Sequence, residues 1–382
     1  MSSNNKKTFG QFYTTNYKYI LQNLEIPLNV KRVIEPFAGK CDLDNFIPKN
    51  RNFESIEYYD IEPKNNKVVK KDTLLEPPSY DNKFILTNPP YLARNKSDND
   101  KKEIYDKYNQ NDLYKCFIES VINSGCLGGI LIIPLNFWSS IRKNDILLRK
   151  KFIEKFNIVK LNIFEETVFT DTTYTICSFQ FEKKTDNLIK EITANIYPSK
   201  KEINFKLFEE NNYTIGGEIY KLNINDKIIV ERATSKTKNN VNDGLTNILV
   251  KCIDDSLENK ISLTYIENKP ILENTSSTDT NNETEETKKN NKYLEDYIDN
   301  TDKLSMRSYA ILIIKPKLTI TKQKKLINDF NKYINKQRNK YNSLFLTNYR
   351  NCNNIARKRI SFALVFDIVN YLLSKSKIDT DY

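Results

Sequence analysis

Short apolar runs alternate with amphipathic stretches along the first half of the chain. Runs of four to eight mainly apolar residues, bounded by polar turns, are typical of buried strands. Two longer stretches, 111–123 and 143–156, carry apolar residues at helical spacing, and each precedes such a run. This alternation predicts a doubly wound, Rossmann-like α/β domain with a mostly parallel sheet. The expected strands are 32–34, 53–59, 84–87, 129–133, 159–163 and 174–181.

The texture of the chain changes after Lys184, where the elements become shorter and less regular. We therefore expect two domains, one over 1–184 and one over 185–382. Within the second, 273–292 consists almost entirely of Asn, Thr, Ser, Glu and Lys. A segment of this composition buries too little apolar surface to order itself, which predicts a disordered insertion.

Local patterns predict further elements inside the two domains. The stretch 93–111 is rich in Asn, Asp and Lys and predicts a polar loop that could close over a substrate. In the second domain, 307–314 is typical of a strand, 322–340 of a basic helix and 361–374 of an apolar helix. Strands and helices grouped in this way indicate a second domain of the α+β class.

Composition excludes several classes of function. The 382-residue chain contains no His, which excludes His-based triads and most zinc sites, and we expect no metal. Its six cysteines form no CxxC pair and are typical of free thiols in a reducing compartment. The first residues lack the apolar core of a secretory signal, and no apolar run is long enough to cross a bilayer. We expect a soluble, intracellular protein without membrane contact, in the cytoplasm of a bacterium or of a virus-infected host cell.

Positive charge is concentrated near the end of the chain. The net charge is +11, and residues 303–377 hold 17 Lys and Arg against 2 Asp and Glu. This one-sided distribution favours a polyanionic partner, most simply nucleic acid. A solvated, lysine-rich surface explains the same charge equally well.

The tetrapeptide Asn88-Pro89-Pro90-Tyr91 directly follows the apolar run 84–87. Neither proline has an N–H, and both fix φ, so the turn is stiff and its carbonyls can point outward. The Asn88 side chain and the Pro89 backbone each offer an oxygen acceptor, and Tyr91 offers a flat ring for stacking. This combination predicts a catalytic site that methylates a planar exocyclic amino group.

Three acids precede this turn, each at the end of an expected strand. Glu35 opens the turn Glu35-Pro36-Phe37-Ala38-Gly39, which is the form in which doubly wound folds hold a nucleoside cofactor. Asp60 follows the next strand and suits ribose hydroxyls, and Asp72 suits an adenine amino group. Each residue alone is equally well explained as part of an ordinary turn or as a capping carboxylate. Their order ahead of Asn88 favours the cofactor interpretation.

The motif series resembles the amino-group DNA methyltransferases that use S-adenosylmethionine. It is most similar to the adenine-N6, type II restriction-modification enzymes with the gamma order, in which the cofactor region comes first and target recognition last. The matching segments are 9–15, the Glu35–Gly39 turn, Asn88–Tyr91, 112–117 and 164–170. The departure is Cys41, which stands where the family has the second glycine of its cofactor turn.

This resemblance implies S-adenosylmethionine as cofactor, duplex DNA as partner and a cognate restriction endonuclease encoded separately. The catalytic residues would be Asn88, Pro89, Pro90 and Tyr91. The residues implied to hold the cofactor are Tyr13, Thr14, Glu35, Pro36, Phe37, Ala38, Gly39, Asp60, Ile61, Asp72, Thr73, Asn88 and Pro90. Those implied to bind the flipped adenine and the DNA are Tyr91, Phe169, Arg350, Arg357 and Arg359.

Two other functions fit the same residues. A protein glutamine amide or an RNA base poses the same chemical problem as adenine, so the tetrapeptide also fits an N-methyltransferase for either substrate. A catalytically inactive relative could keep the fold to bind nucleic acid. The 9–15 motif and the basic second domain favour methylation of DNA.

Overall fold

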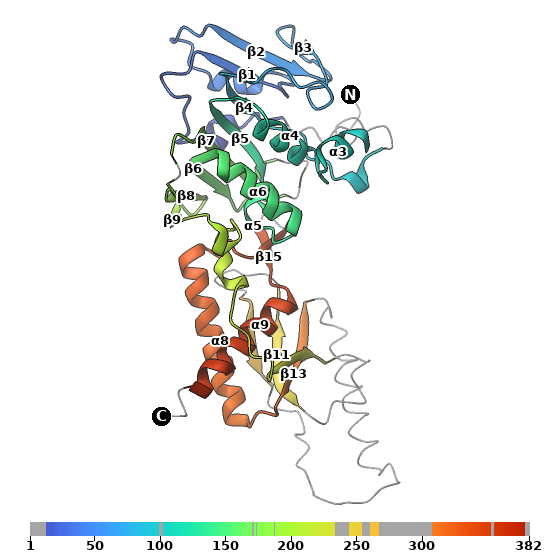
Figure 1. Ribbon diagram of the computed structural model, residues 1–382, viewed down its shortest axis with the longest axis vertical. Helices are drawn as coiled ribbons and strands as arrows, with labels where there is room; N and C mark the ends of the chain where they lie inside the picture. Colours follow the sequence, from blue (N-terminus) through green and yellow to red (C-terminus); the bar gives the residue numbers. More distant parts are fainter. Residues whose placement is uncertain are drawn as a thin grey trace, which may run out of the picture. The chain divides into compact units, whose positions relative to one another are not determined.

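The computed structural model describes residues 13–98, 102–169, 172, 174–186, 188–233, 244–253, 260–266, 308–352 and 355–378, without the side chains of 347–357 and 376–378. The chain divides into two compact units (Figure 1). The first contains Met1–Gly217 and Thr347–Arg357, and the second contains Glu218–Leu346 and Lys358–Tyr382. The expected disordered insertion, 273–292, lies outside the described residues.

A nine-stranded sheet with the order β3-β2-β1-β4-β5-β7-β6-β8-β9 forms the centre of the first unit. Its first five strands are all parallel, whereas β7 is antiparallel to both of its neighbours. The carboxyl ends of β1, β2 and β4 therefore lie at one edge of the sheet. The strands are β1 (Arg32–Glu35), β2 (Ser55–Asp60), β3 (Val69–Lys70), β4 (Phe84–Thr87), β5 (Gly128–Pro134), β6 (Phe156–Phe164), β7 (Ile176–Lys183), β8 (Ile192–Tyr197) and β9 (Lys201–Phe205).

The boundary of the first unit lies after Gly217 and not near Lys184. The reason is that β8 pairs in parallel with β6, and β9 pairs with β8, so both strands extend the same sheet. The apolar positions of β8 are buried within this unit. Strands β8 and β9 are as short as the elements expected in the second domain. The length of the elements alone therefore placed the boundary too early.

Continuous apolar runs account for the central strands, because a parallel strand is covered on both faces. All residues of β4 and β5 are buried. Next to them, α5 (Asn136–Ser139) and α6 (Lys143–Lys155) bring Trp138 and Phe152 against Phe179 of β7, with ring centroids 5.1 and 6.0 Å from that ring. These aromatic contacts fix the helices on the sheet.

The helices that connect the strands agree in part with the prediction. Helices α4 (Leu113–Ile122) and α6 confirm the two expected amphipathic helices. The expected loop 93–111 instead contains η2 (Arg94–Lys96) and α3 (Lys102–Tyr108), because Ile104 and Tyr105 are buried. The remaining elements of this unit are α2 (Tyr17–Ile20), η1 (Asp42–Phe46) and η4 (Glu209–Asn211).

The second unit is an α+β arrangement. Its sheet is antiparallel throughout, with the order β10-β13-β11-β12. Helix α8 packs on β12 and β11, and α9 packs on α8 and β10. The elements are η5 (Gly217–Tyr220), β10 (Ile229–Arg232), β11 (Leu245–Lys251), β12 (Ser262–Tyr265), β13 (Tyr309–Lys315), α8 (Ile320–Tyr341) and α9 (Phe362–Ile378). Two further strands, β14 (Thr347–Cys352) and β15 (Ile355–Arg359), pair with each other, and their residues up to Arg357 belong to the first unit.

Tight turns in this chain use asparagine more often than glycine. Among the described residues, nine that are not glycine have a positive φ, and five of these are Asn. Four glycines share this conformation. The asparagines are Asn23, Asn82, Asn109, Asn212 and Asn342. Within the described part of the chain, every helix is too short or too polar to cross a membrane.

Candidate cofactor and catalytic site

A cavity opens at the edge of the sheet where β1, β2 and β4 end. Twelve of the thirteen residues predicted to hold the cofactor line it; the exception is Pro36, whose carbonyl accepts a hydrogen bond from Thr73 Oγ1 at 3.0 Å. The lining residues are Tyr13, Thr14, Glu35, Phe37, Ala38, Gly39, Asp42, Leu43, Asp60, Ile61, Lys71, Asp72, Thr73, Leu74, Leu75, Asn88, Pro90, Ile104 and Leu113.

The turn after β1 keeps its shape without a second glycine. Gly39 has φ +50°, and a Cβ atom there would lie 3.3 Å from the Tyr13 ring. Cys41, at the position of the family's second glycine, adopts the left-handed conformation itself, with φ 63°. Its thiol is buried against Ala38 and Tyr58, and this burial raises its pKa to about 11. The left-handed backbone of Cys41 costs roughly 1 kcal/mol, and the packing of its side chain offsets part of this cost.

Asp60 and Asp72 hold backbone groups at the cavity wall. Asp60 accepts hydrogen bonds from the N–H groups of Gly39 and Glu62, both at 2.8 Å. Asp72 Oδ1 accepts from the N–H groups of Leu74 and Leu75, both at 3.0 Å. Both acids are therefore capping carboxylates as well as cavity-lining residues. A carboxylate has about four acceptor positions, so each retains capacity for a ligand.

Glu35 is the least satisfied acid in the cavity. Its side chain is 2% exposed, and Oε2 has no hydrogen-bond partner among the residues that the structure describes. Burial, together with the nearby carboxylates of Asp44, Asp42 and Asp60, raises the pKa of Glu35 well above its ordinary value. A buried acceptor without a partner fits a ligand that carries a hydrogen-bond donor or a positive charge.

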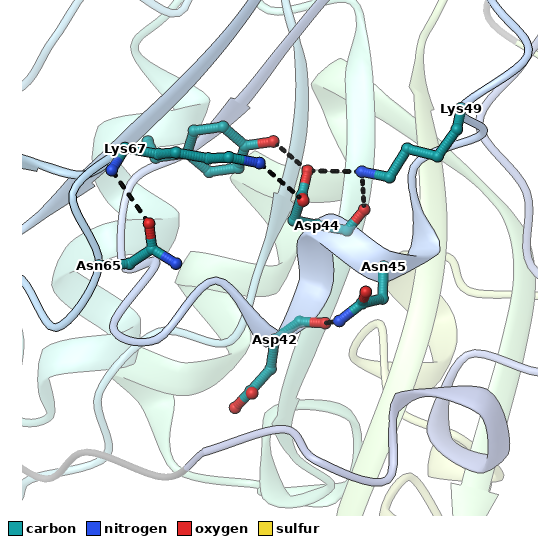
Figure 2. A network of polar contacts seen from close by, with 7 residues as sticks. Asp42, Asp44, Asn45, Lys49, Asn65 and Lys67 are labelled. Carbon is teal, nitrogen blue, oxygen red and sulfur yellow. Dashed lines mark hydrogen bonds and ion pairs between the residues drawn. The ribbon is translucent and has the colours of Figure 1, made fainter.

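The two acids of η1 have different surroundings. Figure 2 shows Asp44 between Lys49 and Lys67, to which its carboxylate is joined at 2.8 and 3.3 Å. Although burial acts in the opposite direction, hydrogen bonds from Lys49 and Tyr58 lower the pKa of Asp44. The carboxylate of Asp42 points away from this network and lines the cavity (Figure 2). Four carboxylates and one lysine, Lys71, thus make the cavity wall predominantly anionic.

Asn88 and Pro90 line the cavity, whereas Pro89 and Tyr91 do not. The Asn88 amide is held from two sides. Its Nδ2 donates to Thr14 Oγ1 at 3.1 Å, and its Oδ1 accepts from the Tyr91 hydroxyl. The single hydrogen of that hydroxyl is shared with the Ile132 carbonyl, which lies 2.7 Å from the Tyr91 oxygen. The side-chain oxygen of Asn88 therefore has a fixed position.

The two rings predicted to stack on a base are buried. Tyr91 is 4% exposed and meets the rings of Tyr114 and Tyr174 edge-on, with centroids 6.1 and 6.3 Å away. Phe169 is 6% exposed and is not part of the cavity lining. In this arrangement neither ring presents a face to a ligand. The signal in the sequence identified the residue types but not their orientation.

The three arginines predicted to contact DNA lie on β14 and β15. The side chains of Arg350 and Arg357 are outside the described residues. Arg359 is half-buried and forms an isolated bridge with Ile253 in the second unit. Their predicted role stays a prediction.

Seven cavity-lining residues were not predicted: Asp42, Leu43, Lys71, Leu74, Leu75, Ile104 and Leu113. Most of them lie within a few positions of a predicted residue, so chain proximity was the available signal. Leu113 follows Asp112, the N-cap of α4 and the first residue of the motif 112–117. Asp112 Oδ1 accepts a hydrogen bond from the Leu92 N–H at 3.2 Å and so joins the helix to the segment that follows the turn Asn88–Tyr91.

Asp112 makes stability depend on pH. Burial raises its pKa to about 7, against an ordinary value of 3.8. The folded protein therefore binds more protons than the unfolded chain between these values, and the free energy of unfolding falls as pH rises through this window. We expect the free energy of unfolding of the parent protein to fall between pH 5 and pH 7.5. In Asp112→Asn, denaturant unfolding should show a fall that is smaller by about 2 to 3 kcal/mol.

The matched control is Asp106→Asn, since this acid is exposed. Glu35 also has a raised pKa, but it is present in all three proteins and cancels from the comparison. Parallel curves of unfolding free energy against pH for all three proteins, the parent, Asp112→Asn and Asp106→Asn, would contradict the assignment of this pH dependence to Asp112.

Residues 24–169 match the model of the family described as Eco57I restriction-modification methylase. This segment ends at Phe169 and contains the turn after β1, the acids and the tetrapeptide. The segment is similar to the restriction-modification methylases. The comparison with curated proteins gave no match.

Solved structures of similar description also match the methylase-like chain. A modification subunit assigned to a type I restriction enzyme of Vibrio vulnificus gives a TM-score of 0.36 at 13% identity, over 50% of this chain and 49% of that one. A type I restriction-modification methyltransferase subunit from Streptococcus thermophilus gives 0.33 at 14%, over 49% and 48%. A protein described as a class I S-adenosylmethionine-dependent methyltransferase from Listeria monocytogenes gives 0.35 at 14%, over 47% and 61%. The chain spans about half the length of the first of these structures.

The methylase resemblance implies S-adenosylmethionine as the cofactor. The residues of the cavity fit this group, because it carries a sulfonium and an ammonium charge. The anionic wall and the unpartnered Glu35 oxygen complement those charges. Phe37 and Leu74 add apolar surface for a flat ring.

Proposed function

We propose that this chain transfers a methyl group from S-adenosylmethionine to the N6 amino group of an adenine in duplex DNA. The observation that carries the proposal is the position of Asn88. Its amide lines the same cavity as the acids at the ends of β1 and β2, and its oxygen is held in place by a neighbouring side chain. The family match to residues 24–169 supports the reaction class.

The chemistry requires acceptors more than acids or bases. The adenine N6 lone pair is delocalised into the ring, so the nitrogen is a poor nucleophile. The bound cofactor supplies an already activated methyl group on its sulfonium. Asn88 Oδ1 would accept one N6 hydrogen, favour a pyramidal nitrogen and stabilise the positive charge that develops on it. After transfer, the methylated nitrogen releases one proton to solvent. A second acceptor at the Pro89 carbonyl stays a prediction, since Pro89 is not part of the cavity lining. This contribution is positioning and electrostatic, and it needs no histidine.

The Tyr91 hydroxyl contacts the Asn88 oxygen that would face the substrate. Together with Thr14, Tyr91 prevents the amide from exchanging its oxygen and nitrogen. We therefore assign Tyr91 a positioning role in the arrangement described. Base stacking by Tyr91 and Phe169 stays a prediction, and it requires both rings to leave their buried positions.

The substrate is proposed on chemical grounds. The N6 atom lies on the base-pairing edge, so the adenine must be extruded from the duplex before it can reach the cavity. The basic excess in residues 303–377 would attract the phosphates of the surrounding DNA. A cognate restriction endonuclease, encoded separately, stays a prediction.

Methyl transfer to defined substrates tests the proposal. The protein is incubated with methyl-tritiated S-adenosylmethionine and, in parallel, with unmethylated duplex DNA, single-stranded DNA, RNA or a protein extract. We expect label in duplex DNA and N6-methyldeoxyadenosine after digestion to nucleosides. Label found as methylated cytosine, or only in RNA or protein, would overturn the proposed substrate and favour the glutamine or RNA alternatives.

A further inference from the structure

We propose that one exposed face of α8 binds the phosphates of duplex DNA through Lys325, Lys332 and Lys336. We name these residues the α8 lysine row. The inference rests on the proposed function and deepens it, because it assigns DNA contact to a surface other than the arginines of β14 and β15. Three features of the helix support it: the spacing of the lysines, their lack of ion pairs within the described residues, and the length of the helix.

Spacing places the three lysines on one side of the helix. Intervals of seven and four residues return to the same face of an α-helix. The structure agrees, since all three lysines are exposed while Phe330 and Ile334 on the other side are buried. Asn328 and Asn339 occupy the same exposed face. The one acid of the helix, Asp329, lies on this side as well, four residues after Lys325 and three before Lys332. The row is thus a polar stripe with a net positive charge and one acid within it.

The lysines of the row form no ion pair within the described part of the protein. The helix carries one acid, Asp329, against three lysines in the row. Other cations of α8 are engaged elsewhere. Lys340 lies 3.6 Å from Glu218, and Lys324 lies over the Tyr265 ring. Like charges four residues apart, such as Lys332 and Lys336, mildly destabilise a helix, and a bound polyanion relieves this repulsion.

Helix α6 shows that a high lysine content alone does not produce such a row. It is also rich in lysine, but four of its five cations have hydrogen-bond or ion-pair partners, and within the described residues Lys143 alone has none. Lys151 bonds to Glu119 at 2.6 Å, Lys150 to Glu154 at 3.9 Å, and Lys155 donates to the carbonyl of Ser124 at 2.6 Å. Three aligned lysines without ion pairs are thus found on α8 and not on α6.

Length and shape favour duplex DNA over other polyanions. Helix α8 has 22 residues, and the row extends over about 16 Å at a rise of 1.5 Å per residue. The duplex carries one charge per about 1.7 Å along its axis, so the row faces several phosphates at once. A straight helix of this kind also fits along or within the major groove. A flexible single strand has no surface of matching rigidity.

The test compares two triple variants of the full chain. The row variant carries Lys325→Gln, Lys332→Gln and Lys336→Gln. The control variant carries Lys150→Gln, Lys190→Gln and Lys206→Gln in the first unit, and it loses the same amount of positive charge. Thermal unfolding and S-adenosylmethionine binding confirm that both variants retain the fold and the cofactor site. The measurement is the Kd for a duplex oligonucleotide at several salt concentrations, with single-stranded DNA and RNA of equal length in parallel.

We expect the row variant to bind duplex DNA about 10- to 100-fold more weakly at moderate salt, and the slope of log K against log salt to fall by roughly 2 to 3. The control variant should keep the slope of the parent. Equal slopes for the two variants would overturn the inference, as would a loss confined to RNA or single strands.

The inference and the proposed function fail in different ways. If the parent methylates duplex DNA and the row variant binds it normally, the surface is wrong and the function stands. If the row governs duplex binding but no methyl reaches DNA, the surface stands and the proposed reaction is wrong.

Discussion

Asn88→Ala is expected to lower methyl transfer by about 100- to 1000-fold while the protein remains folded. The Asn88 oxygen would stabilise the amino group only as positive charge develops on it, and loss of one such preorganised group has an effect of this size. The replaced side chain is small, and its bond to Thr14 is lost together with it. Single-turnover rates at saturating cofactor and DNA measure the effect.

Two further variants make this result specific. Asn204→Ala, the same change at an exposed position of β9, should transfer methyl at the parental rate. Tyr91→Phe keeps the ring but removes the donor to Asn88. If Tyr91 positions Asn88, this variant should lose rate with unchanged cofactor affinity, whereas a purely stacking residue would tolerate it. Full activity of Asn88→Ala would refute the assigned chemistry.

Arg149→Met is expected to destabilise the protein by about 3 to 5 kcal/mol. The Arg149 side chain is fully buried, and burial lowers its pKa to about 10. Its guanidinium donates to the carbonyls of Phe137, Ser140 and Tyr213 at 2.8, 2.6 and 2.9 Å. Methionine fills a similar volume but leaves these buried acceptors without a donor. Equilibrium unfolding in denaturant measures the loss.

Arg142→Met is the matched control, because Arg142 is exposed at the start of the same helix. It should change stability by less than about 0.5 kcal/mol. Arg149→Lys is expected to recover little of the lost stability, since one ammonium group cannot reach all of the acceptors that surround the planar guanidinium. Equal stability of the parent and Arg149→Met proteins would contradict the prediction, because the carbonyls left by the guanidinium would then be hydrogen-bonded by water or after rearrangement.

The buried strands of the first unit were predictable because they are short, apolar and bounded by polar turns. The run 84–87 matches β4 residue for residue, and the neighbouring acids line one cavity as their order indicated. Parallel pairing explains this success, because it brings the ends of non-adjacent strands to one edge. Residues such as Ile104 and Leu43 joined the cavity through tertiary packing, which no local pattern records.

Side-chain orientation was the part that the sequence could not determine. Tyr91 has the residue type and position of a stacking ring, yet its hydroxyl bonds to Asn88 and to the Ile132 carbonyl. The position of Ile132 depends on the pairing of β5 with β4, which is a long-range property. A phenol has both an apolar face and a polar tip, so local chemistry allowed either use.

The asparagine-based turns have a consequence for the unfolded chain. A residue with a Cβ atom samples fewer backbone conformations than glycine when it is unfolded. Each such turn therefore gives up less entropy on folding, by about 0.4 to 1 kcal/mol where the left-handed geometry is tolerated. With five asparagines at these positions, the denatured ensemble is more restricted than it would be with glycine, and this restriction offsets part of the cost of the left-handed backbone in the native state.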